Sequence, residues 1–194
     1  MTKGLEDRKF IPSKIDPCIY YKEDCIVLIY VDDCIIFSKS KSVINSFVYS
    51  LVNGKEKYVL TNEGEIDKYL GVDIVKTKDS TSMTQPYLIQ RCLNEMGITE
   101  EMDIKKTPAT KPLLHKDKEG DPRQHTWHYC TVIGMLNYLK CSTRPDLAMA
   151  VHQCARFCED PKRSHELAVR QIGKYLLGTK DKGIIFKPDQ SIKA

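Results

Sequence analysis

The sequence of 194 residues has no long hydrophobic run. Its longest uncharged apolar segment is about seven residues, whereas a helix needs roughly 20 apolar residues to cross a bilayer. No apolar stretch follows Met1, as a secretory signal would require. We therefore expect an intracellular protein that is not secreted and has no membrane partner.

The sequence also lacks a Cys-x-x-Cys pair, although it contains eight cysteines. Several lie inside apolar runs or helical patterns, such as Cys25, Cys34 and Cys154. In a reducing compartment such cysteines are small buried hydrophobic residues rather than disulfide partners. With 41% hydrophobic and 29% charged residues, the composition is that of a globular chain with a real core.

The segment Tyr30-Val31-Asp32-Asp33 lies between two apolar runs, residues 25–29 and 34–37. Their β-branched and aromatic residues predict two strands, with both aspartates at or near the turn. Two carboxylates at the tip of a largely buried hairpin suit hard divalent cations, which prefer oxygen ligands. Aspartate also favours ordinary turns because it hydrogen-bonds its own backbone, so these four residues alone leave both interpretations open.

The first half of the chain mixes strand and helix patterns. Further strands are predicted at residues 19–21, 58–60, 69–75 and 82–84. Ser40 can cap a helix that ends at Asn53-Gly54, and Pro86 can begin a helix that Gly97 closes. This half is therefore expected to be α+β with antiparallel strands.

The second half has a different character. Residues 99–124 are charged and rich in proline, which predicts a linker. Helices are then expected at about residues 126–140, 145–158 and 161–177. Residues 183–187 form a last strand candidate without an obvious partner.

Six ordered segments together resemble the reverse transcriptase of Ty1/copia-type retrotransposons. They are Asp16-Pro17-Cys18, Tyr30-Val31-Asp32-Asp33, residues 68–74, residues 129–139, Thr143-Arg144-Pro145-Asp146-Leu147 and residues 174–179. The fourth is similar to that family's Y-x-x-x-I-G-x-L-x-Y-L segment. The resemblance spans nearly the whole chain, from Phe10 to Phe186.

The resemblance implies a fragment of a right-hand polymerase that acts as an RNA-directed DNA polymerase. Residues 1–84 would be a partial palm of antiparallel strands plus a helix, with the Tyr-Val-Asp-Asp hairpin and a primer-grip-like strand. Residues 85–124 would be a thumb-like helix and linker. Residues 125–194 would be a helical connection unit toward an RNase H domain that we do not find in this sequence.

The same resemblance implies that Asp32 and Asp33 are catalytic and hold two Mg2+ ions for nucleotidyl transfer. The implied partners are an RNA template, a DNA primer, a dNTP and the rest of the Pol polyprotein. The implied location is a cytoplasmic particle or the nucleus.

Four more residues would contact the primer. Tyr30 would pack near the primer terminus, and Val31 would touch the terminal base pair. Leu70 and Gly71 would hold the primer backbone, because glycine permits close approach. The spacing of Leu70 and Gly71 is equally typical of a β-bulge.

The sequence departs from this family at one catalytic position. The family's third catalytic carboxylate lies on an earlier palm strand, and neither Asp7 nor Asp16 falls where it should be. The metal site would therefore be incomplete, and strands that pair with the absent palm segment would expose edges or apolar faces. We expect no polymerase activity from this chain alone. The alternative is a domesticated, non-catalytic fragment that binds nucleic acid or protein.

Charged residues of the C-terminal helices also have two interpretations. Arg144 and Asp146 lie at a helix start, where a structural role is the usual one. Basic side chains within residues 162–182 can contact phosphates, but a solvated helix face explains them equally well. These side chains are Lys162, Arg163, Arg170, Lys174, Lys180 and Lys182.

Overall fold

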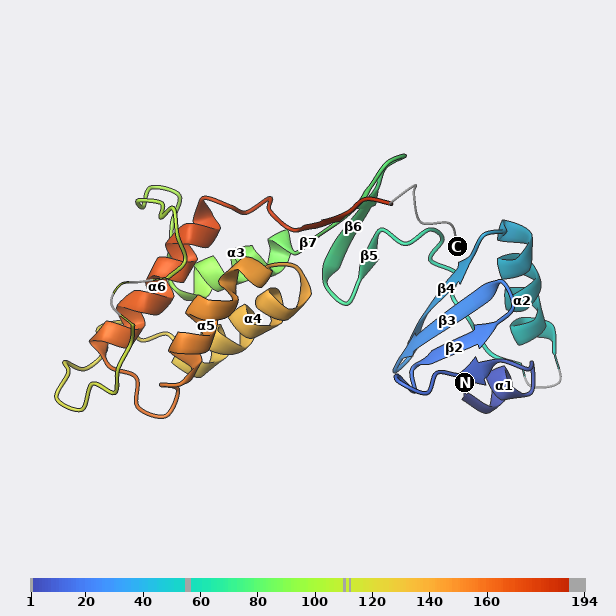
Figure 1. Cartoon of the computed structure of the whole chain (residues 1–194), viewed down its shortest axis with the longest axis horizontal. Helices are drawn as coiled ribbons and strands as arrows, with labels where there is room; N and C mark the ends of the chain where they lie inside the picture. Colours follow the sequence, from blue (N-terminus) through green and yellow to red (C-terminus); the bar gives the residue numbers. More distant parts are fainter. Residues whose placement is uncertain (1, 55–56, 110, 112, 189–194) are drawn as a thin grey trace. The chain divides into compact units, whose positions relative to one another are not determined.

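Figure 1 shows the computed structural model of the chain, which describes residues 2–54, 57–109, 111 and 113–188. The chain divides into two compact units, Met1–Ile66 and Asp67–Ala194. Each unit has its own sheet and its own hydrophobic core.

The first unit combines a four-stranded antiparallel sheet with helices. Its elements are α1 (Thr2–Glu6), β1 (Ile11–Pro12), β2 (Ile19–Lys22), β3 (Cys25–Tyr30), β4 (Asp33–Ser38) and α2 (Lys41–Asn53). The strands lie in the order β1-β2-β3-β4, so each pairs with its neighbour in sequence. The two strands predicted on either side of the aspartates are confirmed.

One face of this sheet forms the first core. Because strand side chains alternate between faces, Cys25 and Val27 of β3 are buried while Ile26 between them is exposed. The buried pair belongs to one hydrophobic cluster with Phe47 and Leu51 of α2. The opposite face stays open.

The second unit contains a second antiparallel sheet and a group of helices. Its elements are β5 (Lys68–Tyr69), β6 (Val72–Lys76), β7 (Thr81–Thr84), α3 (Pro86–Glu95), α4 (Tyr129–Ser142), the 3-10 helix η1 (Pro145–Leu147), α5 (Ala148–Ala155), α6 (Arg163–Leu177) and β8 (Ile184–Phe186). The strand order is β5-β6-β7-β8, so the chain returns after α6 to complete the sheet (Figure 1).

The helices of the second unit enclose the larger core, in which Ile89, Leu136 and Ile172 are fully buried. Pro86 begins α3, where its missing N–H leaves no hydrogen bond unmade. Gly97 follows this helix with a φ of 60°, which glycine adopts without strain. The predicted helix boundaries of α3 are therefore confirmed.

The strand predicted at residues 58–60 is wrong. Tyr58 and Leu60 instead pack as irregular backbone against the first core. Within the described residues no strand pairs with this segment, and an extended segment without a neighbour gains no ladder of hydrogen bonds.

Two other strand predictions change in form. Residues 69–75 make a hairpin of β5 and β6 rather than one strand, because the backbone reverses at Leu70 and Gly71. The strand candidate at residues 183–187 has a partner after all, since β8 pairs antiparallel with β7.

The α+β class with antiparallel strands is confirmed. Within the described ranges, no helix has both the length and the apolar character that a membrane crossing requires.

Candidate active site and nucleic-acid contacts

A two-residue turn of Val31 and Asp32 joins β3 to β4, with Tyr30 paired directly to Asp33. Val31 has a φ of 55°, in the left-handed region that β-branched residues rarely enter. Hairpin turns with a positive φ at this position usually place glycine there. Because backbone strain is kept most often at functional sites, the turn is a candidate site on structural grounds as well.

Both aspartates are exposed at this end of the hairpin. Asp33 shares a face of the sheet with Tyr30, because directly opposite residues of an antiparallel pair point the same way. The expectation of a largely buried hairpin is wrong, since only one of its faces is buried. Tyr30 is 52% exposed and Val31 80%. All four residues of the turn are thus accessible to a large ligand.

The open face of this sheet is apolar. One row of directly opposite residues crosses all four strands on this face: Ile11, Tyr21, Ile26 and Phe37. Each is at least 40% exposed. The edge strand β1 is short and ends in proline, which limits pairing with a further strand. The other edge strand, β4, pairs only with β3 in the described chain, so its outer edge is open. Within the described residues, the sheet therefore has one exposed apolar face and one open edge.

Asp32 and Asp33 do not complete a metal site by themselves. Across the described residues, no group of three or more His, Cys, Asp or Glu side chains is arranged to hold an ion. Hard cations take about six oxygen ligands, and two-metal sites share several carboxylates. The aspartate pair fits part of a magnesium site and does not fit a complete one.

The residues expected to hold the primer backbone, Leu70 and Gly71, form a second two-residue turn, between β5 and β6. Their φ angles are 49° and 73°. Positive φ at both positions is typical of type I′ turns, which favour Asn-Gly, so leucine is strained in the first position. The pair is a tight turn and not a β-bulge. It belongs to the second unit, whereas residues 30–33 belong to the first.

A contact that the sequence did not predict holds this second turn. The Tyr138 hydroxyl of α4 donates a hydrogen bond to the Leu70 carbonyl at 2.6 Å. Tyr138 is 43% exposed, although Leu136 and Leu139 beside it are fully buried. In the sequence, an aromatic residue on the exposed side of this helix was the feature that could have indicated a contact with another element.

Arg144 connects two of the segments that carry the resemblance. Its buried guanidinium donates two hydrogen bonds to the Asp146 carboxylate, at 3.0 and 2.8 Å. It donates two more to Thr179, at the carbonyl (2.9 Å) and the hydroxyl (2.8 Å). The Tyr175 hydroxyl also donates to Asp146, at 2.8 Å. Burial raises the pKa of Asp146, but the hydrogen bonds from Arg144 and Tyr175 outweigh it and lower the pKa. These contacts support the structural interpretation.

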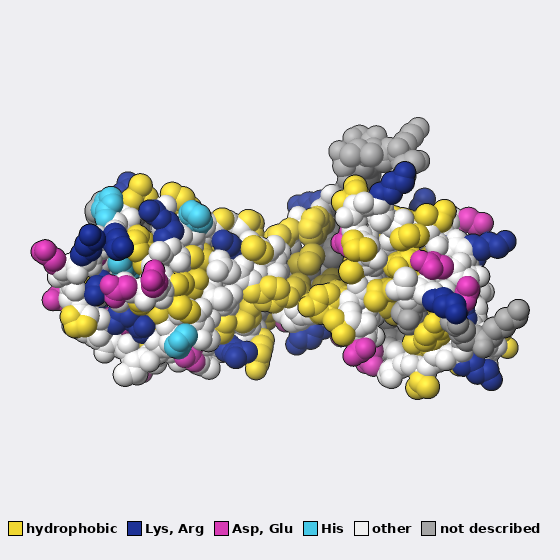
Figure 2. Space-filling view, turned by 90° about the horizontal axis from the view of Figure 1, so that it is seen from below, with side chains coloured by type: hydrophobic (Ala, Val, Ile, Leu, Met, Phe, Trp, Pro, Cys, Tyr) yellow, Lys and Arg dark blue, Asp and Glu magenta, His cyan; other side chains and the backbone are white. Residues whose placement is uncertain are grey.

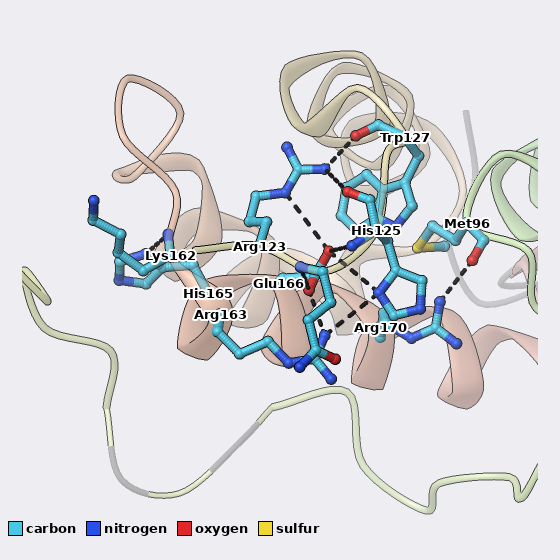
Figure 3. A network of polar contacts seen from close by, with 10 residues as sticks. Met96, Arg123, His125, Trp127, Lys162, Arg163, His165, Glu166 and Arg170 are labelled. Atoms are coloured by element: carbon cyan, nitrogen blue, oxygen red, sulfur yellow. Dashed lines mark hydrogen bonds and ion pairs between the residues drawn. The ribbon is translucent and has the colours of Figure 1, made fainter. Parts of the chain in front are cut away.

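Figure 3 shows another network, around the fully buried carboxylate of Glu166 in α6. This carboxylate accepts hydrogen bonds from the backbone N–H groups of Gln124 (3.1 Å) and His125 (2.9 Å). The guanidinium of Arg163 donates to it as well, and that of Arg123 forms an ion pair at 3.7 Å. Burial raises the pKa of Glu166, but its donors outweigh burial and lower the pKa to about 2. The network fastens the segment before α4 to α6.

Most basic side chains of α6 and its flanks already have acceptors within the chain. The pairs are Lys162 with Asp160, Arg163 with Glu166, Arg170 with the Met96 carbonyl, Lys174 with Asp103 and Lys180 with Glu100. Figure 2 shows Lys and Arg side chains interspersed with Asp and Glu over the helical part of the second unit. This surface therefore resembles the solvated, internally paired helix face more than a phosphate-binding one.

Comparison with known proteins gives a consistent result. A family model described as reverse transcriptase (RNA-dependent DNA polymerase) matches residues 1–111. The chain is 28% identical over 187 residues to the retrovirus-related Pol polyprotein from transposon TNT 1-94 of Nicotiana tabacum. It is 25% identical over 191 residues to that from transposon RE1 of Arabidopsis thaliana. It is also 25% identical over 158 residues to the putative transposon Ty5-1 protein YCL074W of Saccharomyces cerevisiae.

These alignments cover most of this chain but little of the polyproteins. They include 90% and 94% of the chain, yet 14% of the tobacco polyprotein and 12% of the Arabidopsis one. For the yeast protein, 79% of the chain aligns with 49% of the relative. No solved structure matches the chain. Because the family model covers more than half of the chain, and the relatives are Pol polyproteins of transposons, the chain belongs to the reverse transcriptase (RNA-dependent DNA polymerase) family, as a fragment of the Ty1/copia type.

Proposed function

We propose that this chain supplies part of the polymerase site of a Ty1/copia-type reverse transcriptase. The observation that carries the proposal is the strained, exposed turn at residues 30–33, which presents two adjacent exposed carboxylates at one end of a sheet. Residues 1–84 would form part of the palm, residues 85–124 a thumb-like helix and linker, and residues 125–194 a connection unit. The order of the resembling segments along the chain supports this division.

The proposed chemistry is nucleotidyl transfer, in which a primer 3′-hydroxyl attacks the α-phosphate of a dNTP and pyrophosphate leaves. In this class of reaction two Mg2+ ions clamp the attacking and leaving oxygens. Asp32 and Asp33 would offer carboxylate oxygens to such ions. Since the described residues add no third ligand to the pair, we assign no catalytic step to this chain alone. It would be inactive without the rest of the Pol polyprotein.

The proposed nucleic-acid contacts lie on both turns. Tyr30 and Val31 offer an exposed ring and an exposed apolar side chain beside the aspartates, which suits the stacked bases at a primer terminus. Leu70 and Gly71 offer a tight turn to the primer backbone, where the missing Cβ of Gly71 permits close approach. The partners would therefore be an RNA template, a DNA primer and a dNTP.

Two assays with an RNA–DNA hybrid test the proposal. In fluorescence anisotropy we expect binding that weakens as salt rises, because phosphate contacts release counterions. In primer extension on an RNA template we expect no product above the protein-free control. Absence of salt-sensitive binding would contradict the nucleic-acid role. Template-dependent extension would contradict the proposed inactivity of the chain alone.

A domesticated, non-catalytic nucleic-acid-binding or protein-interaction fragment is the second candidate. The observation that favours it is the lack, in the described parts of the chain, of three clustered metal ligands. The double substitution Asp32→Asn and Asp33→Asn separates the two candidates. For a polymerase fragment it should remove the part of the Mg2+ effect on hybrid affinity that exceeds counterion competition, whereas for a non-catalytic module Mg2+ should act equally on wild type and variant. Asp24→Asn, in the exposed β2–β3 turn of the same sheet, is the matched control.

A further inference from the structure

The peptide unit between Leu70 and Gly71 is fixed from one side. Its carbonyl accepts the hydrogen bond from Tyr138 at 2.6 Å. A trans peptide is planar, with its C=O and N–H pointing in opposite directions. The Gly71 N–H therefore points away from the Tyr138 hydroxyl, and the tyrosine fixes the direction of that N–H.

The Gly71 N–H is available to a ligand. It has no acceptor within the described ranges, and Gly71 is exposed. Apart from Gly71 and its two chain neighbours, no heavy atom of the described chain lies within 4 Å of where a Cβ of Gly71 would be, so the space beside the turn is open. A hydrogen bond to the carbonyl of the same peptide also polarises the N–H and makes it a better donor.

The tyrosine that fixes this peptide belongs to a helix packed into the core. Tyr138 belongs to α4, whose residues Ile133, Leu136 and Leu139 are buried in the larger core. The turn would otherwise be free to relax, because leucine with a positive φ costs about 1–2 kcal/mol relative to a right-handed conformation. The hydrogen bond from this packed helix opposes this relaxation.

We propose that Tyr138 is a positioning residue that aims the Gly71 N–H at a phosphodiester oxygen of a bound nucleic-acid strand. This inference rests on the proposed function, in which the turn contacts the primer. A phosphodiester suits the site because backbone N–H groups are common donors to phosphate oxygens, and such contacts set the position of the strand. Lys68 and Asp73, which face each other across β5 and β6, form an ion pair at 3.4 Å. Together they would therefore bring little net charge to the bound phosphate.

NMR titration of the full chain with an RNA–DNA hybrid duplex tests this role. In the wild-type protein we expect the hybrid to shift the Gly71 amide resonance. Tyr138→Phe removes only the hydroxyl, so it should move the Gly71 amide in the free protein, abolish its hybrid-induced shift and weaken affinity about fivefold. Tyr87→Phe, at an exposed position of α3, should change none of these.

The hybrid-induced Gly71 shift is the readout that a purely structural role would not move, and salt dependence distinguishes this neutral contact from a lysine–phosphate contact. Because Tyr138 and Gly71 carry no charge, Tyr138→Phe should leave the slope of log affinity against log salt unchanged, whereas loss of a lysine–phosphate contact lowers it by about one. Binding without a Gly71 shift, or a Tyr138→Phe variant that binds as the wild type does, would overturn the inference while the proposed function stands. Failure of the wild-type chain to bind the hybrid would overturn both.

Discussion

Val31 and Leu70 share an uncommon backbone conformation. Each is the first residue of a two-residue hairpin turn and each has a positive φ. A side chain with a Cβ costs about 1–2 kcal/mol in this region. Burial does not explain the choice of residue, since Val31 is 80% exposed and Leu70 is 37% exposed. An exposed apolar residue at such a cost is consistent with the proposed contact to a ligand.

Replacing Val31 with glycine should stabilise the hairpin. The substitution relieves the strain of the positive φ and removes little buried surface, and the greater freedom of glycine in the unfolded chain offsets part of the gain. We expect a net gain of up to about 1 kcal/mol, or roughly fivefold slower amide hydrogen exchange in β3 and β4. NMR exchange rates at Leu28 and Ile35, which face each other across the two strands, measure it.

Val59→Gly is the matched control for this substitution. Val59 is also fully exposed in the first unit, but its φ is not positive. Glycine there only adds freedom to the unfolded chain, so exchange should stay the same or become faster. Equal slowing by both substitutions would show that strain at Val31 is not the cause.

At the residue scale, the sequence was sufficient to place Asp32 and Asp33 at a turn, because two strand-forming runs flank them. It was not sufficient to predict the conformation of Val31, since valine favours strands and gives no sign of a left-handed φ. The sequence was also not sufficient to predict the hydrogen bond from Tyr138 to Leu70. That contact joins residues far apart in the chain and depends on how the second sheet meets α4.

At the scale of elements, helices were easier to predict than strand pairing. The limits of α2 and α3 follow from local signals, such as Pro86 at the first turn of α3 and Gly97 after its end. Strand partners depend on distant segments. The β8 strand pairs with β7 across almost a hundred residues, whereas residues 58–60 have a strand-like sequence and no strand beside them in the described chain.

The Arg144 network should stabilise the second unit strongly. Arg144→Met keeps an apolar stem but removes both guanidinium hydrogen bonds to the Asp146 carboxylate, which keeps only the one from Tyr175, and the hydrogen bond to the Thr179 carbonyl. We expect a loss of about 2–4 kcal/mol in the free energy of unfolding. Urea unfolding followed by the fluorescence of Trp127, the single tryptophan and a member of the same core, measures this loss.

Arg156→Met serves as the comparison for Arg144→Met. Arg156 is exposed and donates to the Gln153 side chain at 3.1 Å, a contact that water can replace. Its loss should cost less than about 1 kcal/mol. If the two variants unfolded at the same urea concentration, the buried network would not be important for stability.

The Glu166 network predicts a pH dependence of stability. The pKa of Glu166 is lowered from its ordinary 4.5 to about 2, so its ionised form stabilises the folded state above about pH 4.5. This contribution is lost as the pH falls from about 4.5 to about 2. Glu166→Gln should unfold about 2 kcal/mol more easily at neutral pH and show a flatter stability profile through that window.

Urea midpoints of Trp127 fluorescence across this pH range provide the measurement for Glu166→Gln. Glu95→Gln changes an exposed carboxyl at the end of α3 and should keep the wild-type profile. A wild-type slope that persists in Glu166→Gln would assign the pH dependence to other groups.

At the scale of the whole molecule, the chain contains two separate hydrophobic cores. One lies between the first sheet and the helices α1 and α2, and the other among helices α3 to α6. No residue of the described chain belongs to both clusters. The sequence suggested a change of character only after residue 97, because composition changes there. The boundary between the compact units falls earlier, at residues 66 and 67, since the second sheet is completed by β8 from the C-terminal region.

Two cores predict two unfolding transitions. The smaller first core should melt at the lower temperature, because less apolar surface is buried there. Phe47→Ala should lower only this transition, by an amount on the order of 10 °C for a loss of about 3 kcal/mol. Leu136→Ala should lower only the second, which Trp127 fluorescence also reports. Differential scanning calorimetry of the full chain and both variants measures the two temperatures. If either substitution moved both transitions equally, the two units would unfold as one cooperative body.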